Sequence, residues 1–66
     1  MTTEDYEQLA KIVGNTFVAM RRVLGEEGRT LVYDNLYVPL TDYLAESNED
    51  FILSIFAFQV ATAEQV

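Results

Sequence analysis

The side chains closest to supporting chemistry are three acids near the carboxyl end of the chain. Glu46, Glu49 and Asp50 lie close together in the sequence, and carboxylates grouped in this way are ligands for hard cations such as calcium or magnesium. Their spacing does not match the loop of a calcium-binding EF-hand, and acids at the start of a helix are explained by the helix dipole. We therefore predict no metal site.

Nucleophilic and acid–base catalysis have no support in the sequence. The chain contains neither cysteine nor histidine, which removes disulfides, thiolate nucleophiles, imidazole bases and the common zinc ligands. Ser47 and Ser54 have no histidine to activate them, and no glycine-rich turn surrounds either serine. The sequence predicts no catalytic residue, no cofactor and no enzymatic activity.

The net charge of −7 arises entirely beyond residue 24. Up to Leu24 the acids and bases balance, whereas Arg29 is the only base after it. A surface of this kind repels phosphate backbones, so we expect no direct binding to nucleic acid. The residues of the predicted acidic surface are Glu26, Glu27, Asp34, Asp42, Glu46, Glu49 and Asp50.

Residues 3–24 have the most regular pattern in the chain. Mostly apolar residues recur there at spacings of three and four, which predicts an amphipathic helix. Thr2 or Thr3 can cap its start, and Gly25 can end it. Gly14 costs about 1 kcal/mol relative to alanine inside a helix, and it marks either a close approach of a neighbouring backbone or a loosened helix. The residues of the stripe are Tyr6, Leu9, Ile12, Val13, Thr16, Phe17, Met20, Val23 and Leu24.

Residues 25–28 form a predicted connector, and the stretch that follows it has two interpretations. A helix over 30–46, kinked or split near Pro39 because proline removes a hydrogen bond, is favoured. The alternative is an α+β fold with a hairpin over 30–40 that turns at Asp34 and Asn35. The hairpin is disfavoured because it lacks an obvious third strand. The helix would place on one face Val32, Leu36, Leu40, Tyr43 and Leu44.

Residues 48–63 are predicted to form a helix at the centre of the core. Ser47 can cap its start, with Asp50 completing a capping box. Between residues 51 and 60 only Ser54 and Gln59 are polar, so the helix is apolar nearly all round and must be covered on more than one side. In a chain of 66 residues this predicts a second copy as cover, since small domains need such reinforcement. The predicted interface residues are Phe51, Ile52, Ile55, Phe56 and Phe58.

Two stretches carry a resemblance to a known group. DYEQLA at 5–10 and LTDYLAESNEDFILSIF at 40–56 resemble the opening and closing patterns of short helical proteins encoded by actinobacterial phages and prophages. The resemblance implies two long helices with a shorter third and a phage source, and it implies no activity. The chain departs from the group where Glu49 replaces a usual proline and where apolar residues replace charged ones between the two phenylalanines. The matching residues of the closing pattern are Leu44, Ala45, Asn48, Phe51 and Phe56.

Together these features predict an all-α bundle of three helices completed by dimerisation. The predicted function is a small acidic protein-interaction module without enzymatic activity, encoded by a phage or prophage, which forms a homodimer and binds a host or viral protein. One alternative is an acidic mimic of DNA that inhibits a host nucleic-acid-binding enzyme, and another is a minor virion or assembly protein. The acidic N-terminus and the lack of an apolar run of about 20 residues predict no export and no membrane association. We expect a cytoplasmic location, in the host if the source is a phage.

Overall fold

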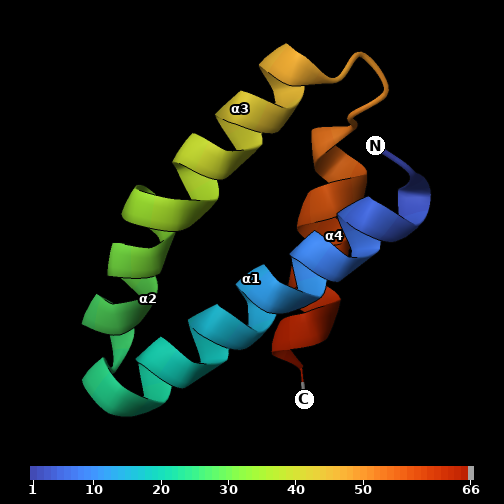
Figure 1. Cartoon of the computed structure of the whole chain (residues 1–66). Helices are drawn as coiled ribbons and strands as arrows, with labels where there is room; N and C mark the ends of the chain where they lie inside the picture. Colours follow the sequence, from blue (N-terminus) through green and yellow to red (C-terminus); the bar gives the residue numbers. More distant parts are fainter. Residues whose placement is uncertain (66) are drawn as a thin grey trace.

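The structure is a computed structural model that describes residues 1–65, and within that range all the regular structure is helical. The elements are α1 (Thr3–Leu24), α2 (Glu26–Val32), the π-helical turn η1 (Tyr33–Tyr37), α3 (Val38–Ser47) and α4 (Leu53–Glu64). Because α2, η1 and α3 follow one another without a break, they form one long rod, here called the second rod (26–47), which stands beside α1 and α4 (Figure 1). The prediction of an all-α fold is confirmed. The hairpin over 30–40 is not supported, since these residues are helical.

Helix α1 begins and ends where the sequence predicts. The Thr2 hydroxyl accepts a hydrogen bond from the Asp5 backbone N–H (3.2 Å), and the Thr2 N–H donates to the Asp5 carboxylate (3.0 Å). This capping box satisfies donors that the first helical turn leaves without partners, and the Thr2 hydrogen bonds lower the pKa of Asp5. At the other end the Gly25 N–H donates to the Arg21 carbonyl (2.8 Å).

The corner between α1 and the second rod is tighter than the predicted connector over 25–28. Only Gly25 lies between the two helices, and its positive φ of 68° is a conformation that favours glycine. Gly28 is buried inside α2, where a Cβ atom would overlap the Met20 carbonyl of α1. The chain therefore turns at one glycine and brings the two helix backbones together at the other (Figure 1).

The core lies where α1, the second rod and α4 meet. A Cβ atom added to Gly14 of α1 would lie 2.5 Å from the Ala63 Cβ and 2.9 Å from the Val60 carbonyl of α4. Of the two interpretations of Gly14, the close approach of a neighbouring backbone is therefore the one confirmed. The buried apolar residues are Ala10, Val13 and Phe17 of α1, Val32 and Leu44 of the second rod, and Phe56 and Val60 of α4.

The second rod turns part of its predicted stripe to the core: Val32 and Leu44 are buried and Leu40 packs against them. Its predicted stripe is wrong at Leu36, which is exposed, and at Tyr43, which is 65% exposed. In η1 the Val38 N–H donates to the Tyr33 carbonyl, five residues back, so the turn contains one extra residue. Tyr37 therefore packs against the core in place of Leu36. Buried Thr41 follows one α-helical turn later.

Pro39 lies in the first turn of α3, directly after η1. In a regular α-helix its ring would clash with the carbonyl four residues back, and a wider turn just before it relieves that constraint. Tyr37 and Val38 both keep right-handed helical dihedral angles. The kink predicted near Pro39 stays a prediction.

Helix α4 starts later than predicted. Ser47 is the last residue of α3 and not a cap, residues 48–52 form a loop, and α4 begins at Leu53 with no side-chain cap at Ile52. The predicted capping box is wrong because Ser47 belongs to α3 and both Ser47 and Asp50 precede the start of α4. Asp50 instead accepts a hydrogen bond from the Tyr6 hydroxyl (2.8 Å). Phe51 next to it packs on the Tyr6 ring, with 5.5 Å between centroids. Contacts between the start of α1 and the loop before α4 thus replace the predicted local capping box.

Candidate interaction site on helix α4

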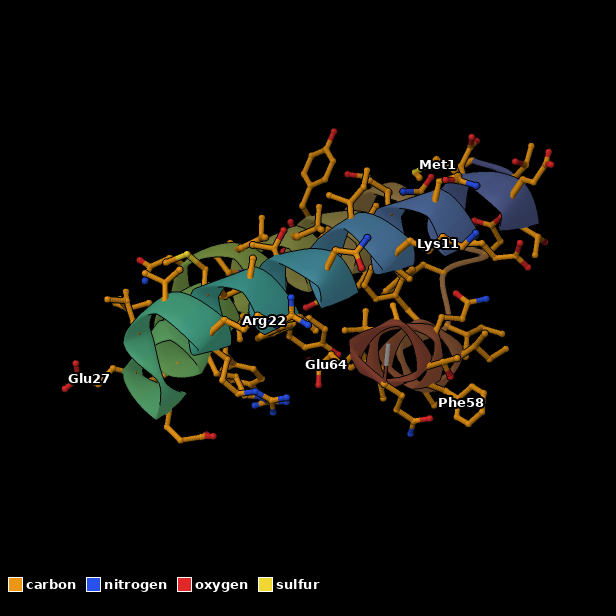
Figure 2. The ribbon with its side chains drawn as sticks, turned by 90° about the horizontal axis from the view of Figure 1, so that it is seen from below. Met1, Lys11, Arg22, Glu27, Phe58 and Glu64 are labelled. Atoms are coloured by element: carbon orange, nitrogen blue, oxygen red, sulfur yellow. The ribbon has the colours of Figure 1, made fainter. Side chains whose placement is uncertain are left out.

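Helix α4 is apolar on both its inner and its outer side. On the inner side Phe56 is 1% exposed and Val60 is buried. On the outer side Phe58 is 73% exposed and Ile55 is 53% exposed. Figure 2 shows α4 nearly along its axis, with Phe58 pointing away from α1. We define the outer face of α4 as the exposed residues Ser54, Ile55, Phe58, Ala61 and Thr62.

The structure divides the predicted interface residues between surface and core. Ile52, Ile55 and Phe58 are exposed, in agreement with a role at a surface. Phe56 is a correction, because its ring is buried in the core, 6.4 Å from the Tyr37 ring between centroids. Phe51 is half-buried at the core edge and packs on Phe56, with 5.5 Å between ring centroids.

Sequence reasoning missed Leu53, which is exposed beside Ile52 at the start of α4. A helix that is apolar all round does not reveal which side faces the core. The signal that could have oriented it lies in α1, where Gly14 marks the line along which α4 approaches.

The outer face of α4 is uncharged, and its two flanks are balanced in charge. Glu64 is the only charged residue of α4, and it pairs with Arg29 at 3.6 Å. The Arg29 guanidinium also lies 5.0 Å from the centroid of the Phe17 ring, a cation–π contact. On the other flank, a groove between α1 and α4 is lined by Glu7 and Lys11 together with α4 residues that include Phe58. Each flank therefore carries one acid and one base.

The predicted acidic surface lies elsewhere and is spread out. Its seven residues are all exposed, with Glu26 to Glu46 along the second rod and Glu49 and Asp50 in the loop before α4. A helical rod of that length extends about 33 Å. Among residues 1–65 no group of three or more acids could hold a metal ion. The acids therefore form an extended strip of charge.

Three of the four tyrosines make aromatic contacts, and Tyr43 is exposed. Partial burial and the hydrogen bond to Asp50 raise the pKa of Tyr6 to about 12. The Tyr6 hydroxyl joins the start of α1 to the loop before α4. Tyr33 and Tyr37 stack with 5.4 Å between ring centroids in η1. Burial, followed by the charge of Tyr33, raises the pKa of Tyr37.

Two further observations bear on function. No helix within residues 1–65 combines the length and the apolar character needed to cross a membrane. Comparison of the chain with protein-family models, with curated proteins and with solved structures finds no match. The resemblance to short phage proteins therefore stays a prediction.

Proposed function

We propose that this protein is a small interaction module that pairs with a second copy of itself through the outer face of α4. The observation that carries the proposal is the 73% exposure of Phe58 at the middle of an uncharged helical face. A buried phenylalanine removes on the order of 150 Å² from water, and large aromatic side chains dominate interface energetics. In a monomer the Phe58 side chain stays in contact with water, so this stabilisation is not gained.

The area available suits a small homodimer. A specific interface needs about 500 Å² from each partner, roughly a ninth of the 4585 Å² surface of this chain. Phe58 supplies on the order of 150 Å² of that. Ile55 of the same face is more than half exposed, and the exposed Ile52 lies close to it at the start of the helix.

Charge supports the outer face of α4 as the surface on which a second copy would dock. Two copies of a chain with a net charge of −7 repel each other, so they meet most easily where neither has unbalanced acids. A second exposed apolar group lies at the corner of α1 and α2, where Val23 is 75% exposed. Glu26 and Glu27 lie at that corner. A symmetric pair formed there would place these two acids of one copy against the same two acids of the other.

Light scattering after size exclusion tests this proposal. We expect about twice the chain mass of 7.5 kDa at micromolar concentration, and Phe58→Asp should raise the dimer Kd by at least about 30-fold, since a hot-spot residue is worth 2 kcal/mol or more. Val23→Asp is the matched control, because Val23 is equally exposed outside α4, and its dimer should persist. Circular dichroism should show that both variants fold. A monomeric wild-type chain would contradict the proposal, as would equal loss of dimer in the two variants.

The source and partner form a wider part of the same proposal. The resemblance over 5–10 and 40–56 supports a phage or prophage source. The proposal adds that the protein acts in the host cytoplasm and binds a host or viral protein. A role as a minor virion or assembly component is compatible with the same surface. Capture of proteins from host lysate by the wild-type chain, compared with Phe58→Asp, tests whether partner binding needs the dimer.

A second candidate function is mimicry of DNA, which the exposure of all seven predicted acidic residues favours. The inhibited enzyme would bind the strip of charge along the second rod in place of a phosphate backbone. Partner capture at low and high salt separates the two candidates. Binding through acids should weaken steeply as salt rises, whereas apolar docking should change little.

A further inference from the structure

The outer face of α4 is divided lengthwise into a side of small residues and a side of larger ones. At 100° per residue, Ser54 and Ala61 lie on one side of Phe58, and Ile55 and Thr62 lie on the other. All five residues are exposed. Phe58 is near the middle of the twelve-residue helix Leu53–Glu64. Phe58 therefore stands at the centre of the face, and only the side of Ser54 and Ala61 leaves space for an aromatic ring.

We infer that two copies pair α4 against α4 in antiparallel orientation, with the two-fold axis passing beside Phe58. This inference rests on the proposed function and adds its geometry. A two-fold axis perpendicular to both helices places the small side of one copy over the small side of the other. Ser54 then lies next to Ala61 of the second copy, and the two Phe58 rings share the space above these small residues. Ile55 and Thr62 of both copies close the opposite side.

The parallel arrangement is poorer in both packing and charge. A two-fold axis along the helices would set the small side of each copy against the larger side of the other, so the space for the two rings would be divided. Close packing disfavours that arrangement. Parallel pairing would also bring the two Glu64 residues to the same end and align the helix dipoles. Antiparallel pairing separates the Glu64 residues by about the length of α4, or roughly 18 Å.

Disulfide trapping tests the geometry, because the natural chain has no cysteine to give a background. In the antiparallel pair Ser54 and Ala61 of opposite copies differ by about one residue along the axis, whereas the two Ser54 residues are about 12 Å apart along it. A disulfide needs Cα atoms within about 7 Å. We therefore compare the double variant Ser54→Cys/Ala61→Cys with each single variant under mild oxidation. Both positions are exposed, so the substitutions should leave the fold intact.

The double variant should form covalent dimers at least tenfold faster than either single variant, as read by non-reducing electrophoresis. Light scattering and circular dichroism on the reduced variants should show folded dimers in all three. Single variants that cross-link as fast as the double variant would overturn the antiparallel arrangement. Absence of cross-linking in a chain that still scatters as a dimer would overturn it too, while leaving the proposed function intact. A monomeric wild-type chain would overturn both.

Discussion

Helices α1 and α4 pack against each other but distribute their apolar residues differently. In α1 the buried residues Ala10, Val13 and Phe17 lie on one side, and the exposed large apolar residues are Ile12 near the middle of the helix and the adjacent pair Val23 and Leu24 at its end. In α4 the buried Phe56 is followed two residues later by Phe58, which is exposed. The exposed pair of α1 lies at the corner beside the acids Glu26 and Glu27, whereas the exposed ring of α4 lies near the middle of a helix whose only charged residue is Glu64. The exposed apolar residues of α4 are therefore the ones that the proposed dimer buries.

The sharpest way to break this comparison is to truncate one ring on each side of α4. Phe56→Ala removes a buried ring and should lower the free energy of unfolding by about 3–5 kcal/mol, most of the stability of a domain of this size. Phe58→Ala should change the unfolding of the monomer by no more than about 0.5 kcal/mol. Urea unfolding in dilute solution, where the chain is monomeric, measures both. Equal losses would mean that the two sides of α4 do not differ.

A second variant tests the contact between the two helices. Gly14→Ala would normally stabilise a helix by about 1 kcal/mol. Here the added Cβ would lie 2.5 Å from the Ala63 Cβ, and overpacking of this kind costs about 1–3 kcal/mol. We expect a net loss of stability in thermal or urea unfolding. The exposed neighbour Asn15, replaced by alanine, serves as the control and should leave stability unchanged or slightly raised. A Gly14→Ala chain as stable as the control would contradict the close approach of α1 and α4.

The smallest effect concerns the hydrogen bond that joins the start of α1 to the loop before α4. The pKa of Tyr6 is raised to about 12 in the folded chain, against 10.0 for an ordinary tyrosine. Above pH 10 the unfolded chain releases the phenolic proton while the folded chain retains it, so stability falls as pH rises from about 10 to about 12. Below pH 10 the contribution is fully present. Thermal unfolding across this range should show a shallower decline in Tyr6→Phe, and identical pH profiles would show that the hydroxyl is not held as described.

The sequence was sufficient to predict the structure where local signals decide it. The bounds of α1 follow from Thr2, Gly25 and the stripe between them. It was insufficient where distant residues decide. The local sequence assigns Asp50 to a capping box, whereas in the structure its carboxylate accepts a hydrogen bond from Tyr6, which is 44 residues away in the sequence.

The candidate site could be predicted in composition but not in orientation. The sequence identifies the apolar run of α4, and Ile52, Ile55 and Phe58 are exposed as an interface requires. Phe56 could not be separated from Phe58, because a helix without a polar side contains no information on which way it faces. In the second rod the π-helical turn brings Tyr37 to the core in place of Leu36, while Val32 and Leu44 stay on the predicted side, and no propensity rule marks that local change.

Because η1 contains one extra residue, a single deletion there has a different consequence from a deletion elsewhere in the second rod. A chain that lost one residue from Tyr33–Tyr37 would rewind as an ordinary α-helix with Val32 and Leu44 still facing inward, but Pro39 would then lie inside regular helix. A deletion elsewhere in the rod would swing one end through about 100°. We therefore expect relatives of this chain to have their single-residue gaps at this turn, and those with a gap to have lost the proline.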